Sequence, residues 1–178
     1  MPSLLNIDLL LIATGAWLLL GFAGLFPSRN KRFISSLLFP LGAVVGVIVG
    51  LVAIAALGDA PQTAVLAIGL PNLPFHLRLD NLAAIFILLL GIVSAGISVY
   101  AAGYFRHDHG IPLGLLCLEY HIFLASMLVV LLADDAYAFM VAWETMALSS
   151  FFLVTTDHRH EAIRRAGYLY LLIAHIGA

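Results

Sequence analysis

Long apolar runs with few charged residues dominate this chain, and they restrict its fold more than any other feature of the sequence. Six runs occupy approximately residues 8–26, 34–57, 81–104, 112–132, 137–154 and 162–178. A helix needs about 20 apolar residues to cross roughly 30 Å of bilayer hydrocarbon. The runs are continuously apolar and do not alternate with polar residues, so they predict helices and not barrel strands. We expect an all-α, polytopic membrane bundle of about six transmembrane helices.

The composition supports a bilayer as the surrounding solvent. Hydrophobic residues make up 63% of the chain and charged residues 10%, against about 45–50% and about 25% in soluble domains. A chain so poor in charge does not favour a nucleic-acid partner, and we expect none. The single cysteine, Cys117, has no second thiol with which to form an internal disulfide.

The connectors between the runs predict the orientation in the membrane. One set holds seven of the eight Lys and Arg residues, and the other holds Arg78 alone. The positive-inside rule therefore places the first set in the cytoplasm and the N-terminus outside. Residues 1–7 contain no Lys or Arg, so we expect the first run to be a retained span and not a cleaved signal peptide. The cytoplasmic set is Arg29, Lys31, Arg32, Arg106, Arg159, Arg164 and Arg165.

Two further features shape the predicted bundle. Residues 58–79 contain Pro61, Pro71 and Pro74, which break the apolar stretches and predict a hairpin or surface loop on the outer side. We place a division here, with residues 1–79 as a two-helix segment and residues 80–178 as a second unit. Gly42, Gly46 and Gly50 lie four residues apart and predict a face where another helix backbone packs closely.

Glu144 is the strongest candidate for chemistry. It lies about eight residues into the fifth run, roughly 12 Å deep at about 1.5 Å per residue. Ionisable residues inside the membrane are costly and usually belong to ion pathways or proton relays. No residue on its own helix face neutralises it, so a partner must come from another helix or the carboxyl must hold a proton. The alternative is a structural, hydrogen-bonded glutamate.

His175 is the second candidate. It lies about 13 residues into the sixth run, at a depth similar to that of Glu144 on a neighbouring antiparallel helix. Histidine titrates near neutral pH, which suits a proton relay. The alternative is a histidine that only joins helices by hydrogen bonds.

Three further residues are weaker candidates. Glu119 and His121 lie in the inner half of the fourth run and are candidates for a path from the cytoplasm. Their spacing of two points them to different helix faces, so both cannot line one path equally. Arg165, at the start of the sixth run, is a candidate auxiliary cation for the proton path, with anchoring at the interface as the alternative.

Metal and cofactor sites are not predicted. His107 with His109, and His158 with His160, offer only two imidazoles each, whereas a metal site needs three or four ligands. The sequence has no phosphate-binding glycine loop, nucleophile elbow, haem motif or cluster motif. We expect neither a metal nor a cofactor in this chain.

The segment 125–135 followed by Trp143-Glu144 and Leu148-Ser149-Ser150 resembles one family. It is similar to the antiporter-like membrane subunits of respiratory complex I, Mrp-type sodium/proton antiporters and group 4 nickel-iron hydrogenases. The block from Arg164 to Gly177 looks most like the hydrogenase-4, or formate hydrogenlyase, branch of this family, and Asp80-Asn81-Leu82 also fits. The resemblance covers most of the chain from Leu79 onward.

The resemblance implies a function for this chain. The family's essential glutamate corresponds to Glu144, and His175 falls where the hydrogenase branch has a histidine. We expect a non-redox, proton-translocating subunit in the plasma (inner) membrane, with other membrane subunits and a peripheral hydrogenase or dehydrogenase arm as partners and protons, or sodium, as the ions moved. The alternative functions are an Mrp-type sodium/proton antiporter subunit and a structural membrane scaffold without ion transport. The family's cationic partner of the glutamate belongs to a later helix, so we expect a fragment or truncated product.

Overall fold

The computed structural model describes residues 5–26, 31–70, 73–106 and 111–177. All six predicted runs form helices. They are α1 (Asn6–Ala23), a continuous helix made of α2 (Lys31–Phe33), η1 (Ile34–Leu38) and α3 (Phe39–Ala56), α4 (Asn81–Tyr104), α5 (Leu113–Leu132), α6 (Ala136–Val154) and α7 (Glu161–Gly177). Two strands, β1 (Gln62–Leu70) and β2 (Leu73–Leu79), lie between α3 and α4.

Five of these helices are long and apolar enough to cross a membrane: α1, Lys31–Ala56, α4, α5 and α6. Their outward faces carry exposed leucine, isoleucine and valine, as expected for side chains that meet lipid; Leu19, for example, is 72% exposed. The expectation of an all-α, polytopic membrane protein is therefore confirmed. The helix α7 has 17 residues and falls short of this set, so a sixth crossing stays a prediction, as does the outward N-terminus.

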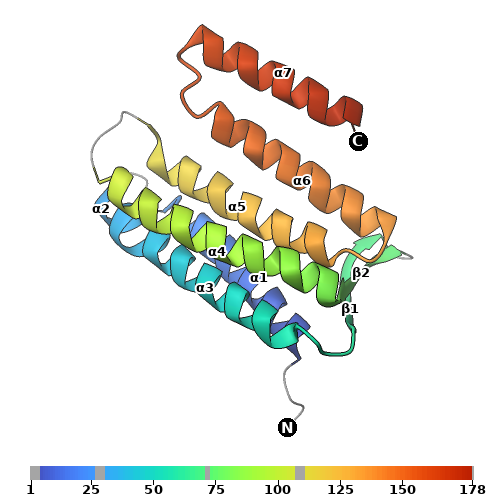
Figure 1. The fold of residues 1–178 in the computed structure, drawn as a ribbon. Coiled ribbons are helices and arrows are strands. Elements are labelled where there is room, and N and C mark those ends of the chain that lie inside the picture. The colour runs from blue at the N-terminus through green and yellow to red at the C-terminus, as the bar shows by residue number, and fades with distance from the viewer. Residues whose placement is uncertain (1–4, 27–30, 71–72, 107–110, 178) are drawn as a thin grey trace.

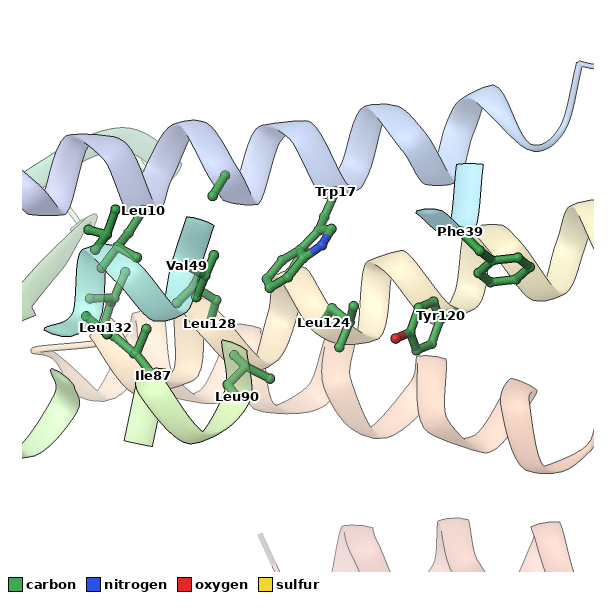
Figure 2. Packing of buried hydrophobic residues seen from close by; sticks show 14 of the residues in the cluster. Leu10, Trp17, Phe39, Val49, Ile87, Leu90, Tyr120, Leu124, Leu128 and Leu132 are labelled. Carbon is green, nitrogen blue, oxygen red and sulfur yellow. The ribbon is translucent and has the colours of Figure 1, made fainter. Parts of the chain in front are cut away.

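The helices form successive layers (Figure 1). The core lies where α1, α3, α4 and α5 pack together, and α6 covers α5 while α7 lies against α6. Large side chains from all four inner helices fill this core, including Trp17, Val49, Ile87 and Leu128, each 0% exposed (Figure 2). The inner four helices therefore form a packed support against which α6 is held.

The predicted glycine face is a contact between α3 and α4. A Cβ added to Gly91 of α4 would lie 2.6 Å from the Gly50 nitrogen and 2.8 Å from the Gly46 oxygen. One added to Gly46 would lie 2.6 Å from Ser94 Oγ. Only residues without a side chain allow two helix backbones to approach so closely.

A π-helical turn, η1, interrupts the helix that contains α3. The Phe39 N–H donates to the Ile34 carbonyl, five residues back, and Pro40 follows immediately. Proline has no N–H and its ring clashes with the carbonyl four residues earlier. The wider turn accommodates Pro40 without breaking the helix.

The predicted outer connector is an antiparallel β-hairpin of β1 and β2. The register shifts between Leu66 and Gly69, and Gly69 has φ +126°, a value that side chains disfavour. The hairpin lies at the end of the bundle where α4 and α6 begin (Figure 1). Leu77 also forms an isolated β-bridge with Ala133, which lies in the short connector between α5 and α6. The hairpin is therefore attached to this connector.

Candidate proton site and the chain's relatives

The contact between α6 and α7 brings the two main candidate residues together. Three contacts lie along this antiparallel pair. Gly167 lies directly against Thr155, Ser150 Oγ and the Tyr170 hydroxyl share a hydrogen bond, and Glu144 lies opposite His175. The small residue at position 167 lets the helices approach, and the polar contacts follow toward the hairpin end of α6.

Glu144 and His175 are at ion-pair distance. Glu144 Oε2 lies 3.5 Å from His175 Nε2, with the two side chains 37% and 49% exposed, respectively. The sequence predicted similar depths and left their facing open. The geometry shows that they face each other near the middle of α6, about 12 Å from its first residue at about 1.5 Å per residue.

The other imidazole nitrogen restricts the protonation states of this pair. His175 Nδ1 lies 3.0 Å from the Leu171 carbonyl oxygen. A carbonyl only accepts hydrogen bonds, so Nδ1 must carry the hydrogen. Nε2 then interacts favourably with Oε2 in two states: imidazolium beside carboxylate, or neutral imidazole beside a protonated carboxyl. Both states hold one proton between the two groups.

Arg165 is not part of this contact. Its side chain is exposed, and it lies ten residues before His175 on α7, about 15 Å away along the helix axis. Within the described residues, His175 is the ionic partner that the structure gives Glu144. A role for Arg165 as an auxiliary cation therefore stays a prediction without a contact to support it.

His121 points into the inner bundle. It is 0% exposed, its ring stacks on Phe39 with centroids 6.1 Å apart, and Nδ1 lies 2.8 Å from the Cys117 carbonyl oxygen. Its Nε2 has no hydrogen-bond partner among the described residues. Gly42 provides the space for the ring, because a Cβ there would lie 2.7 Å from Nε2.

Glu119 faces away from His121, as the spacing predicted. It is half-buried and lines a cavity of about 230 Å³ between α5 and the last turn of α6, with Phe152, Thr155 and His158. This cavity lies at the end of the bundle that the charge pattern assigns to the cytoplasm. Glu119 and His121 therefore face different spaces, and a proton-path role for either residue stays a prediction.

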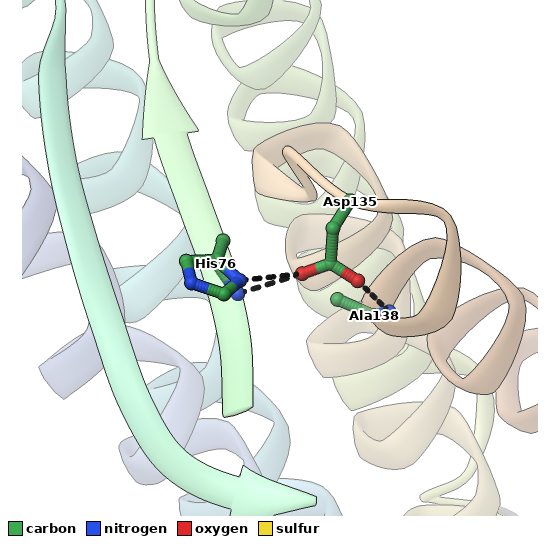
Figure 3. A network of polar contacts seen from close by, with 3 residues as sticks. All are labelled: His76, Asp135 and Ala138. Atoms are coloured by element: carbon green, nitrogen blue, oxygen red, sulfur yellow. Dashed lines mark hydrogen bonds and ion pairs between the residues drawn. The ribbon is translucent and has the colours of Figure 1, made fainter. Parts of the chain in front are cut away.

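Asp135 and His76 form a contact that the sequence did not predict (Figure 3). Asp135 Oδ2 accepts the backbone N–H of His76 at 2.8 Å and lies 3.3 Å from His76 Nδ1. Asp135 Oδ1 accepts the Ala138 N–H at 2.7 Å and so caps α6. The Ala138 N–H, followed by the His76 N–H, lowers the pKa of the Asp135 carboxyl. Asp135 thereby joins the start of α6 to the hairpin.

The structure offers no cluster for a metal ion among its described residues, where no group of three His, Cys, Asp or Glu side chains converges. His160 Nδ1 instead lies 3.1 Å from Asp157 Oδ2. His107 and His109 lie outside the described residues.

These features define a class of protein: a multi-pass helical membrane protein with an acid–imidazole pair between two outer helices. Residues 66–113 match the family model of the N-terminus of chain 5 of NADH-ubiquinone oxidoreductase (complex I). An uncharacterized protein of Mycobacterium tuberculosis is 35% identical over 136 residues, which cover 74% of this chain and 21% of that protein. Hydrogenase-4 component B of Escherichia coli is 37% identical over 102 residues, which cover 57% and 15%, respectively.

A solved structure shares the fold. It belongs to the membrane-bound sulfane sulfur reductase, an archaeal respiratory membrane complex, and has a TM-score of 0.68 at 19% identity over 92% of this chain and 34% of that one. The chain is similar to antiporter-like membrane subunits, with the complex I chain 5 N-terminal domain matched in residues 66–113 and hydrogenase-4 component B among its relatives. It spans about a fifth of the length of the uncharacterized Mycobacterium tuberculosis protein.

Proposed function

We propose that this chain is part of a proton-translocating membrane subunit of a respiratory oxidoreductase complex. The observation that carries the proposal is the contact of Glu144 with His175 at 3.5 Å near the middle of α6. The similar proteins support it, because they include a subunit of complex I and component B of hydrogenase-4. We place the complex in the plasma membrane, with the arginine-rich connectors in the cytoplasm.

The proposed mechanism uses the single proton held between the two side chains. Glu144 releases its proton when a cationic group lies beside it, and it takes up another when that charge withdraws. His175 is the local group that stabilises the ionised carboxylate. The second unit, residues 80–178, carries all the proposed proton groups, with Glu119 in the cavity near the cytoplasmic entrance. A peripheral hydrogenase or dehydrogenase arm would supply the energy through electron transfer.

Glu144→Gln in the assembled membrane complex tests this proposal. Glutamine keeps the side-chain shape but cannot ionise, so we expect electron transfer to soluble acceptors to continue while proton uptake by sealed vesicles is lost. The control is Glu161→Gln, which removes an exposed carboxylate at the start of α7 and should leave pumping unchanged. Normal pumping by the Glu144→Gln complex would overturn the proposed role.

Two alternatives are separated by further measurements. For a sodium/proton antiporter, proton movement in the same vesicles would require sodium and persist without an electron donor. For a structural scaffold, infrared difference spectra would show no carboxyl band that is present in the native complex and absent from the Glu144→Gln variant. A Glu144 band that appears and disappears with turnover supports the relay.

A further inference from the structure

A continuous groove runs along the surface between α4 and α5. It consists of two adjoining cavities of about 270 Å³ and 290 Å³ that share Phe86 and Leu131. The longer part is lined by α4 from Phe86 to Ile97 and by α5 from Tyr120 to Leu131. The second part continues toward the hairpin and ends at Arg78.

The groove has the chemistry and the length of an acyl-chain site. Side chains such as Leu89, Val93 and Met127 make its longer part almost wholly apolar. From Leu82 to Ile97 the groove follows about 22 Å of helix at 1.5 Å per residue. One leaflet of a bilayer contributes about 15 Å of hydrocarbon, half of the roughly 30 Å core, so a single chain fits within the groove.

The groove differs from the glycine-lined contact between α3 and α4. Where α4 meets α3, Gly46, Gly50 and Gly91 bring the backbones together, as small residues do in membrane interfaces. The groove is lined instead by bulky side chains, including Phe86, Phe123 and Met127, which leave a space of about 270 Å³ beside them. A flexible hydrocarbon chain can follow and fill a space of this shape.

The hairpin end of the groove carries charges of both signs. Arg78 and Asp80 line it, with Arg78 Nε 3.7 Å from Asp80 Oδ2, and Asp134 lines the same cavity and is exposed. The Arg78 and Asp80 side chains are 47% and 38% exposed. A guanidinium group binds phosphate through paired N–H donors, while a carboxylate binds an ammonium group.

We propose that this groove binds a phospholipid with an ethanolamine headgroup. One acyl chain lies between α4 and α5, the phosphate contacts Arg78, and the ammonium contacts Asp134. A glycerol headgroup would bring its phosphate charge to two carboxylates with no ammonium to offset them. A choline headgroup has no N–H to donate to Asp134.

The test is native mass spectrometry of the purified protein in detergent. The probes are phosphatidylethanolamine, phosphatidylglycerol and phosphatidylcholine with identical palmitoyl and oleoyl chains. We expect one phosphatidylethanolamine to bind at least about tenfold more tightly than the other two, about 1.4 kcal/mol. Val93→Trp, which fills the groove, should weaken this binding by about tenfold or more. The matched control, Ile92→Trp, changes an exposed neighbour on α4 that does not line either cavity and should bind normally.

A second variant keeps the test decisive if Val93→Trp fails to fold. Asp134→Ala leaves the apolar groove and Arg78 intact but removes the carboxylate that accepts from the ammonium, so it should remove the preference for phosphatidylethanolamine over phosphatidylcholine while phospholipid still binds. Equal binding of the three lipids by the native protein, retention of lipid by folded Val93→Trp, or an unchanged preference in Asp134→Ala would overturn the proposal. So would a protein that retains no phospholipid, which is the result expected if another protein segment fills the groove.

Discussion

His175 Nε2 lies 3.5 Å from Glu144 Oε2 across the packed faces of α6 and α7, while His175 Nδ1 is held by the Leu171 carbonyl. The ring orientation is therefore fixed by its own helix, and the free nitrogen is directed at the acid. We therefore predict that the proposed proton translocation depends on the imidazole, because glutamine in its place cannot carry a positive charge.

His175→Gln should slow proton translocation by up to about fivefold, since a partly exposed ion pair contributes up to about 1 kcal/mol. The measurement is the initial rate of proton uptake by vesicles at constant electron-transfer rate. His160→Gln, on the exposed connector before α7, is the matched control. A native rate in the His175→Gln complex would show that Glu144 does not depend on this imidazole.

Gly91→Ala should lower the free energy of unfolding by about 1–3 kcal/mol, because the added methyl group would meet the backbone of Gly46 and Gly50. Gly96→Ala is the control on the same helix: its Cβ would have no heavy atom within 4 Å, and alanine favours a helix. Denaturant titration in detergent micelles measures both. Equal stability of the two variants would contradict the close α3–α4 contact.

Gly42→Ala and His121→Ala should interact when combined. The Gly42→Ala methyl would lie 2.7 Å from His121 Nε2, so this change should destabilise the native protein by about 1–3 kcal/mol. In the His121→Ala background the imidazole ring is absent, so the methyl group has space and the destabilisation by Gly42→Ala should be smaller. A double-mutant cycle by denaturant titration measures this coupling, expected at about 0.5–3 kcal/mol, and additive effects would disprove it.

Asp135→Asn should change the acid stability of the protein. The folded-state pKa of Asp135 is lowered by the N–H groups of Ala138 and His76, so its ionised form stabilises the fold above the unfolded pKa, about 3.9. This stabilisation is lost as pH falls through the lower folded value.

The measurement for Asp135 is the Tm between pH 6 and pH 2.5. Asparagine still caps the helix but carries no charge. The difference in Tm between native and variant protein should therefore be largest at pH 6 and shrink toward pH 2.5. Asp134→Asn is the adjacent control, because the contact of residue 134 with His76 uses its backbone N–H. A difference in Tm that does not change with pH would refute the assignment.

The sequence predicted the helices well because each is a continuous apolar run, and the cost of exposed backbone in lipid leaves such a run no alternative to a helix. The prolines of residues 58–79 predicted a hairpin or a surface loop for a similarly local reason, and a hairpin forms there. The glycine spacing on α3 predicted a close contact, and Gly91 of α4 is the residue that completes it.

The remaining features depend on contacts between distant residues. The direction in which His175 points depends on the rotation of α7 about its axis, and the Asp135–His76 contact joins residues 59 apart in the chain. The π-helical turn before Pro40 was equally absent from the prediction, because a proline within a run indicates a kink without specifying its form. The proton-relay roles of Glu144, His175, Glu119, His121 and Arg165 stay predictions.

The interlocked glycines of α3 and α4 also restrict where this protein can move. Sliding one of these helices along the other would push Gly46 or Gly91 against a larger residue. We therefore expect α3 and α4 to behave as one rigid unit. Any displacement that accompanies the proposed proton movement would therefore have to leave the α3–α4 contact unchanged.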